Sequence, residues 1–176
     1  QATIDSACAG GTVILLAPDI KEELPVLYLR LRDAVQKKRI RLIEISSHET
    51  GLTKYAWKSI RAESGTAAAA IPALLAQADI ATQLASGQVV VVAGRPNLAE
   101  SASHTMDALS AVLTVAPSAS VLPVLRRGNV RGALSLGLAP RNGNDAAAIL
   151  EASAQGNVDC LILLGADPLS DVADVD

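Results

Sequence analysis

The sequence predicts an α/β fold built on a doubly wound parallel sheet, and two patterns along the chain support this class. The first is a set of short aliphatic runs at residues 12–16, 89–92 and 161–164, which are typical of strands buried on both faces. The second is the series of stretches between these runs, in which apolar residues recur at helical spacing. Strands that alternate with helices predict parallel, right-handed βαβ units of the Rossmann-like kind.

The first βαβ unit begins with the strand predicted at residues 12–16. Asp19 is placed to cap a following helix, with Glu22 three positions later as in a capping box. Pro25 suits a first helical turn, so the regular helix is expected to begin there. The alternating sequence IRLIEIS at residues 40–46 predicts the second strand. The helix carries an apolar stripe of Leu24, Leu27, Tyr28, Leu31, Ala34 and Val35.

Two helical stretches are expected between residue 47 and residue 87. The first is a short helix within residues 52–59, after the turn at Gly51. The alanine-rich stretch 62–72 leaves two alternatives open, a loop of small residues or a helix. Residues 72–87 have a clear helical pattern, which Gly87 ends as a C-terminal stop.

The second half of the chain repeats the alternation of strands and helices. The strand at residues 89–94 is the least ambiguous element of the chain. Pro123 makes the next predicted strand an edge strand or a loop. The remaining expected elements are a helix at 95–116 capped near Asn97, the strand at 120–126, a glycine-rich loop at 126–144, a helix at 145–154 and a last strand at 160–165.

These elements suggest two lobes. The first βαβ lobe is residues 1–87, and the second α/β lobe is residues 88–176, truncated at its C-terminal end. One continuous domain is the alternative. The chain opens within a polar, small-residue stretch and stops just after a predicted strand, so we expect a piece of a longer polypeptide.

Composition restricts the class of function. Half of the 176 residues are hydrophobic but only 2% are aromatic, so the core must be built from aliphatic side chains. The net charge of −3 and the pI near 5.4 argue against a nucleic-acid-binding protein, which is usually basic. The basic clusters at residues 37–41 and 126–131 contain no interleaved aromatic residues, so we interpret them as solvated rims.

Cysteine spacing and hydropathy exclude further classes. Cys8 and Cys160 lie far apart and cannot hold an iron–sulfur cluster or a tetrahedral zinc ion, so no metal ligand is predicted. Cys160 is interpreted as a buried thiol at the start of a strand, and a disulfide stays open. No apolar run approaches the roughly 18 to 20 residues of a membrane-spanning helix, and no signal peptide precedes the first strand.

Two aspartates follow predicted strands, where α/β sheets bind their ligands. Asp19 ends the stretch TVILLAPD, and Asp167 ends the similar stretch CLILLGAD. Either carboxylate could accept hydrogen bonds from a ribose or a guanine edge, but capping of the next helix is the favoured interpretation. Neither a GxGxxG fingerprint nor a GxxxxGK[ST] loop occurs, which argues against an unrelated nucleotide-binding domain.

The glycine-rich loop is the other candidate site. Arg127, Asn129 and Arg131 could bind a phosphate there, while a flexible connection with a solvated basic edge explains the same residues equally well.

His48 lies in a polar loop and His104 within a predicted helix, and no catalytic Ser/His/Asp set can be assembled. The role of His48 stays open, and no catalytic residue is predicted.

Several phrases of the chain resemble a known family. PDIKEELPVLYLRLRDA followed by RLIEISSHETGLTKYAW resembles the large, G-type subunit in the peripheral arm of NADH-quinone oxidoreductase, the respiratory complex I. More broadly, the chain is similar to the molybdopterin oxidoreductase superfamily, whose order of glycine loop, helix, strand and G-x-D-P is matched by NVRGALSLGLAP, AAILEASAQGNVDC and LILLGADPLSDVAD. The resemblance covers nearly the whole chain after about the first ten residues.

The resemblance implies a molybdopterin-oxidoreductase-like domain downstream of an iron–sulfur region. Iron–sulfur clusters are therefore expected in the parent subunit, and no cofactor is expected in this fragment. In catalytic relatives, loops after the strands hold a molybdopterin guanine dinucleotide. The positions that match such loops are Pro18, 129–132 and 165–168, and the cofactor-binding candidates are Asp19, Asn129, Arg131, Gly165 and Asp167.

Two hypotheses of function follow from the resemblance. The first is a non-catalytic scaffold fragment of this large peripheral-arm subunit, inactive alone, whose parent complex passes electrons from NADH through iron–sulfur clusters to quinone. Its partners would be other subunits of the peripheral arm, with no nucleic acid and no direct membrane insertion. It would be cytoplasmic, peripheral to the inner face of the cell membrane through the parent complex. The alternative is a fragment of a molybdopterin-dependent oxidoreductase that retains part of a guanine-dinucleotide pocket.

Overall fold

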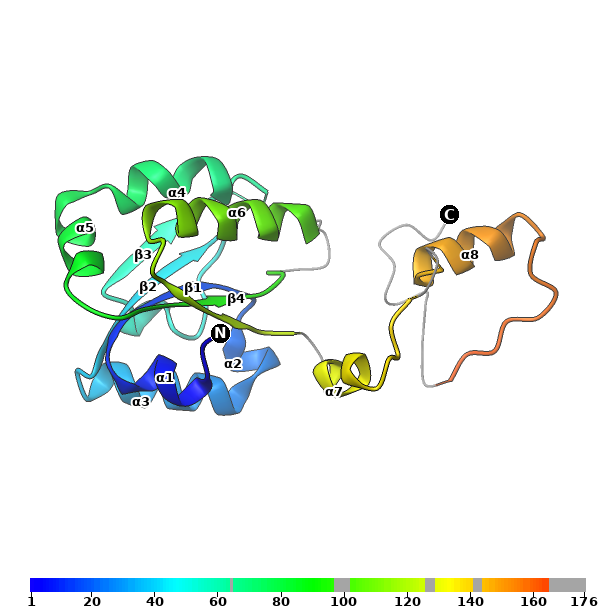
Figure 1. The fold of residues 1–176 in the computed structure, drawn as a ribbon, viewed down its shortest axis with the longest axis horizontal. Coiled ribbons are helices and arrows are strands. Elements are labelled where there is room, and N and C mark those ends of the chain that lie inside the picture. The colour runs from blue at the N-terminus through cyan, green and yellow to red at the C-terminus, as the bar shows by residue number, and fades with distance from the viewer. Residues whose placement is uncertain (64, 97–101, 126–128, 141–143, 165–176) are drawn as a thin grey trace. The chain divides into compact units, whose positions relative to one another are not determined.

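Five parallel strands form one sheet in the order β3-β2-β1-β4-β5 (Figure 1). The computed structural model describes residues 1–63, 65–96, 102–125, 129–140 and 144–164. The chain divides into unit 1, Gln1–Arg127, which contains the sheet, and unit 2, Gly128–Asp176. The strands of unit 1 are β1 (Gly11–Leu16), β2 (Ile40–Ser46), β3 (Lys58–Arg61), β4 (Val89–Ala93) and β5 (Ser120–Pro123).

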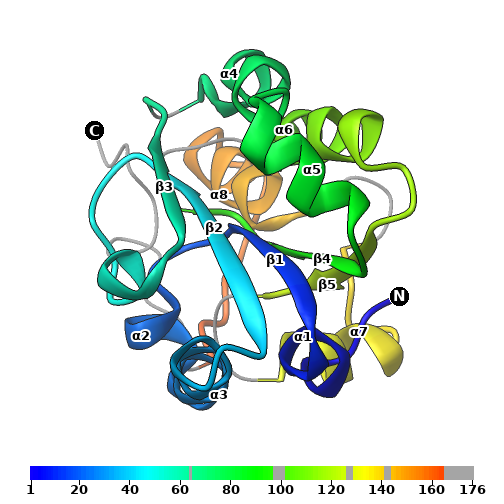
Figure 2. The ribbon, with the colours of Figure 1, turned by 90° about the vertical axis from the view of Figure 1, so that its left-hand side faces the viewer.

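Strand β1 lies at the centre of the sheet, between β2 and β4 (Figure 2). Ile14 pairs in register with Ile43 on one side and with Val91 on the other. Because both edges of β1 are hydrogen-bonded and both faces are covered, its aliphatic run is almost completely buried. The predicted α/β class with a doubly wound, Rossmann-like parallel sheet is confirmed.

Helices cover both faces of the sheet, as Figure 2 shows. One face packs against α1 (Ile4–Ala9), α2 (Ile20–Glu23) and α3 (Pro25–Gln36). The other face packs against α4 (Ala67–Leu75), α5 (Ala78–Ala85) and α6 (Ala102–Val115). The alternation of side chains along each strand divides the aliphatic core into two clusters, one under each helix layer.

Two predicted helix signals are confirmed, the cap at Asp19 and the helix start at Pro25, whereas α1 before the first strand was not predicted. Asp19 caps α2, and its side chain accepts a hydrogen bond from the backbone N–H of Lys21. The chain then restarts as α3 at Pro25, because proline needs no intrahelical donor in a first turn. Strand β5 is an edge strand that ends at Pro123, one of the two predicted alternatives.

Two predictions between residues 52 and 87 need correction, and one open alternative is decided in favour of a helix. The short helix expected within residues 52–59 is only a 3₁₀ turn, η1 (Thr53–Tyr55), and the edge strand β3 follows it. Strand β3 has no strand signal in the sequence, because three of its four residues, Lys58, Ser59 and Arg61, are polar. The helix expected at 72–87 is two helices, α4 and α5, bent by 83° at their break. The alanine-rich stretch is helical from residue 67, so α4 includes Pro72.

The predicted division between residues 87 and 88 falls inside unit 1. It lies between α5 and β4, whereas β4 and β1 are hydrogen-bonded neighbours in the same sheet. The residues on both sides of it therefore share one core. The backbone N–H of Thr12 even donates to the carbonyl of Gln88, across the predicted boundary.

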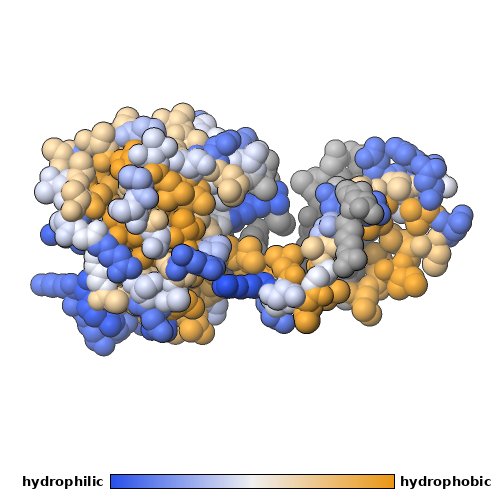
Figure 3. Space-filling model, in the orientation of Figure 1, coloured by the Kyte–Doolittle hydropathy of each residue, from blue (hydrophilic) through white to orange (hydrophobic). Residues whose placement is uncertain are grey.

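Unit 2 contains α7 (Val130–Ser135) and α8 (Ala146–Ala154), and α8 confirms the helix predicted at 145–154, with Asp145 as its N-cap. The glycine-rich stretch is not a loop throughout, because α7 occupies part of it. Residues 160–164 are not a strand, so that prediction is wrong for the described part. No described residue of unit 2 is buried, and hydrophobic surface is widespread in the space-filling view (Figure 3).

The cysteines and the helix lengths complete the description. Cys8 is buried and Cys160 is exposed, both as free thiols, so the interpretation of Cys160 as a buried thiol is wrong. Residues 160–164 have no paired strand among the described residues to bury that thiol. Across the described ranges, no single helix is long and apolar enough to cross a membrane, and α4 and α5 reach that length only when counted together.

Candidate functional site

The order of the strands marks one place where a ligand is expected. Successive connections lead from β1 to β2 and β3 on one side, and then to β4 and β5 on the other. In open parallel sheets of this kind, ligands bind beyond the carboxyl ends of the strands where the order reverses. Here that place lies beyond Leu16 of β1 and Ala93 of β4, which are paired in register.

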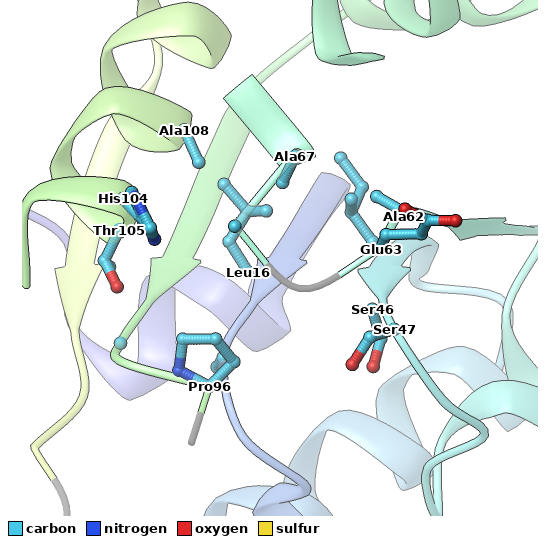
Figure 4. A pocket seen from close by; sticks show the side chains of 14 residues that line it. Leu16, Ser46, Ser47, Ala62, Glu63, Ala67, Pro96, His104, Thr105 and Ala108 are labelled. Carbon is cyan, nitrogen blue, oxygen red and sulfur yellow. The ribbon is translucent and has the colours of Figure 1, made fainter. Parts of the chain in front are cut away.

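A cavity lies at this point, on the side of the sheet covered by α4 and α6 (Figure 4). It encloses about 480 Å³ when the open solvent at its mouth is included. Its floor and walls are mainly apolar. The residues that line it are Leu16, Ala17, Ile45, Ser46, Ser47, Ala62, Glu63, Gly65, Ala67, Gly94, Pro96, His104, Thr105 and Ala108.

Polar side chains reach the cavity from opposite sides. Ser46 and Ser47 come from the carboxyl end of β2, and His104 and Thr105 come from the first turn of α6, across the cavity in Figure 4. The hydroxyl oxygen of Thr105 is buried and has no hydrogen-bond partner in the described part of the chain. Hydroxyl and imidazole groups both donate and accept hydrogen bonds, and the Glu63 carboxylate also lines the cavity, so this rim suits a polar group that forms hydrogen bonds.

The backbone around the cavity is shaped for close approach. Helices α4 and α6 both begin at the cavity, and free N–H groups at helix N-termini favour negative charge. Gly65 has a left-handed φ of 78°, and a Cβ there would lie 3.1 Å from Nδ1 of His104. Glycine is therefore required for His104 to keep its place beside the turn before α4.

A buried carboxylate lies on the other face of the same strand ends. Glu44 of β2 is 1% exposed, and four side chains donate to its two oxygens. Oε1 accepts from the hydroxyl of Thr50. Oε2 accepts from Thr53 Oγ1 at 2.7 Å, Ser59 Oγ at 3.0 Å and Arg61 Nη1 at 3.4 Å. A buried carboxylate needs such donors, because its desolvation is otherwise very costly.

Asp19, the first predicted site residue, is bonded within the chain. Its Oδ1 accepts from the backbone N–H of Lys21, and its Oδ2 accepts from the backbone N–H of Gly51, each at 3.0 Å. Asp19 does not line the cavity. The carboxylate therefore joins the end of β1 to the turn that follows β2, in addition to capping α2.

The other predicted candidates lie outside the sheet unit. Asn129 and Arg131 belong to unit 2, where Asn129 is the N-cap of α7 with a left-handed φ of 59°. A Cβ on Gly132 would lie 2.1 Å from Oδ1 of Asn129, so this glycine makes room for a side chain of the chain itself. Gly165 and Asp167 lie outside the described residues.

Sequence reasoning misses the residues around the cavity for a definite reason. In the sequence, His104 is a helical residue without a partner at ligand spacing, and Ser46 and Ser47 are only the end of a strand. The exposed His48, whose Nδ1 lies 3.3 Å from Ser47 Oγ, does not line the cavity. The one usable signal in the sequence is that these residues follow predicted strands. It predicts a shared site only once β1 and β4 are known to be neighbours in the sheet.

The described residues offer few groups for metal binding or thiol chemistry. No three His, Cys, Asp or Glu side chains of that part of the chain are grouped to hold a metal ion. Burial raises the pKa of the Cys8 thiol, which keeps it protonated and less reactive.

Comparison with protein-family models and with curated proteins finds no match to this chain.

Proposed function

We propose that this chain is a non-catalytic scaffold module of the large peripheral-arm subunit of NADH-quinone oxidoreductase, within the molybdopterin-oxidoreductase-like part of that subunit. The ordered phrases from residue 18 to residue 57 carry the resemblance on which this proposal depends. Other subunits of the peripheral arm would be its partners. The parent subunit would carry the iron–sulfur clusters and lie on the cytoplasmic side, peripheral to the inner face of the membrane.

One structural observation favours a scaffold. Two carboxylates within those phrases, Asp19 and Glu44, form hydrogen bonds inside the chain. Asp19 accepts two backbone N–H groups, and Glu44 accepts four side-chain donors. Side chains bonded in this way stabilise the carboxyl edge of the sheet, and a ligand would have to break these bonds to use them.

Co-purification from the native cell tests the scaffold proposal. The gene is tagged, and the protein that contains the chain is isolated from detergent-solubilised membranes. We expect it to fractionate with inhibitor-sensitive NADH:quinone reductase activity, and the separately purified chain to contain no stoichiometric iron or molybdenum. Fractionation away from that activity would reject the assignment to complex I.

The cavity supports a second candidate, part of a guanine-dinucleotide pocket of a molybdopterin-dependent oxidoreductase. It lies where an α/β sheet of this order binds nucleotides, and two helices begin beside it. Titration of guanosine monophosphate and guanosine diphosphate into the chain by calorimetry separates the two candidates. Saturable heat that is lost in Gly65→Val, which fills the space beside His104, supports the pocket. No heat at millimolar ligand supports the scaffold.

A further inference from the structure

A cluster of polar residues crosses the carboxyl ends of two adjacent strands, and neither candidate function gives it a role at the cavity. It consists of Glu44, Thr50, Thr53, Ser59 and Arg61, and is called the Glu44 clasp below. Glu44 is on β2, Ser59 and Arg61 are on β3, and the two threonines are on the segment that joins these strands.

The clasp holds this connecting segment through the Glu44 carboxylate, in addition to the bond that Gly51 donates to Asp19. Thr50 and Thr53 both donate to Glu44, and the backbone N–H of Thr50 donates to Thr53 Oγ1 at 2.8 Å. The backbone N–H of Leu52 donates to Thr50 Oγ1 at 3.1 Å. Each threonine hydroxyl therefore joins the backbone of the turn to Glu44. The apolar anchor of the same turn is the buried Leu52.

The same segment begins at the cavity. Ser46 and Ser47 line the cavity, and Thr50 follows only three residues later. A chain of three residues spans at most about 11 Å, so the position of the turn limits where the two serines can lie. The clasp also holds β3, whose end leads directly to Ala62 and Glu63 in the cavity wall.

We propose that Glu44 is a positioning residue for the cavity: from the opposite face of the sheet, it holds the β2–β3 connection and so fixes the serine side of the cavity rim. Loss of its charge releases Thr50, Thr53 and Arg61 together, because all of them donate to this one side chain. The connection then opens locally while the sheet stays folded. The clasp shapes the rim whichever of the two candidate functions holds.

Native-state hydrogen exchange tests this in Glu44→Gln. The amides of Thr50 and Leu52, which donate to the threonine hydroxyls of the clasp, are expected to lose at least about tenfold more protection than the β4 amides. Thr12→Val is the matched control, since Thr12 is a buried polar residue of β1 that accepts from Gln83 and lies outside the clasp. It should lower protection evenly or not at all.

A cysteine probe measures the rim itself. Ser46→Cys is introduced together with Cys160→Ser, which leaves the buried Cys8 as the other thiol. Addition of Glu44→Gln should raise the rate at which a thiol reagent labels residue 46 several-fold, and addition of Thr12→Val should not. If Glu44→Gln does not fold, Thr53→Val removes one donor and leaves the carboxylate, with the same expected direction. Uniform loss of protection with unchanged labelling would show that Glu44 only stabilises the core, and would overturn the proposal.

Discussion

Two stretches of this chain are close in sequence and opposite in structure. TVILL at residues 12–16 and CLILL at residues 160–164 are both short aliphatic runs followed by a small residue and an Asp. Ile14 is 0% exposed in the central strand, whereas Ile162 is 84% and Leu164 is 93% exposed. Strand β1 has β2 and β4 as neighbours, and no described strand pairs with residues 160–164. An apolar run becomes a buried strand only when both of its edges and faces find partners.

The largest expected effect tests the buried member of the pair. Ile14→Ala removes a side chain packed among the second cluster of the core, so it should lower the free energy of unfolding by about 2–5 kcal/mol. Urea denaturation followed by circular dichroism measures this. A loss below about 1 kcal/mol would mean that this site collapses around the cavity and that burial distinguishes the two runs less than expected.

A second prediction concerns the Asp that follows β1. Asp19→Ala removes the cap of α2 and the bond to Gly51, which should cost about 0.5–2 kcal/mol of unfolding free energy. Asp145→Ala is the matched control, because Asp145 caps α8 in unit 2 and bonds only within its own helix. The control should leave the unfolding midpoint of unit 1 unchanged. An equal shift in both variants would contradict the separate roles given to the two caps.

Acid should affect the unit that contains β1. The hydrogen bond from Lys58 holds the pKa of Asp79 below its usual range, and Lys37 does the same for Asp33. Since the folded pKa is lowered, the contribution of Asp79 to stability is complete above the ordinary Asp pKa of about 4 and is lost as the pH falls through the lower folded value.

Asp79→Asn should therefore flatten the fall of unit 1 stability below about pH 4, with little change at pH 7 because the pair is exposed. Thermal unfolding followed between pH 2 and pH 7 shows the slope. The matched control is Thr82→Ala, because Thr82 lies on the same helix as Asp79 and its replacement leaves the ion pair intact. Ser59→Ala is not used, because Ser59 belongs to the Glu44 clasp. An acid slope that is unchanged in Asp79→Asn would contradict this prediction.

The smallest effect is expected at the exposed member of the pair. Ile162→Ala should change the free energy of unfolding by no more than about 0.5 kcal/mol, because its side chain is already in water. The same urea titration as for Ile14→Ala provides the direct comparison. A loss of about 2 kcal/mol or more would show that residues 160–164 are buried in solution, and the contrast between the two runs would fail.

Local signals predicted the elements whose physics is local. The start of α3 followed from Pro25, and the cap of α2 followed from Asp19. These features depend on a few neighbouring backbone groups, so a short sequence contains all that is needed. The mostly polar β3 and the break between α4 and α5 gave no such signal.

The candidate site could not be predicted in the same way. His104, Ser46 and Gly65 lie far apart in the sequence and meet only because β1, β2 and β4 are adjacent in the sheet. Glu44 occupies a position in an alternating strand that is ordinarily apolar, and its donors come from a turn and from β3. Neither set has a motif, because each is defined by strand order instead of spacing along the chain.

The sequence by itself determined the α/β class, the central aliphatic strand and the helix caps, since periodicity and capping are properties of neighbouring residues. Only the tertiary structure decided that β1 is buried while residues 160–164 are exposed, and that a cavity and the Glu44 clasp flank the same strand ends. The burial of a strand and the hydrogen bonding of a buried polar group depend on partners from distant segments of the chain. The order of the strands in the folded sheet decides which segments these are.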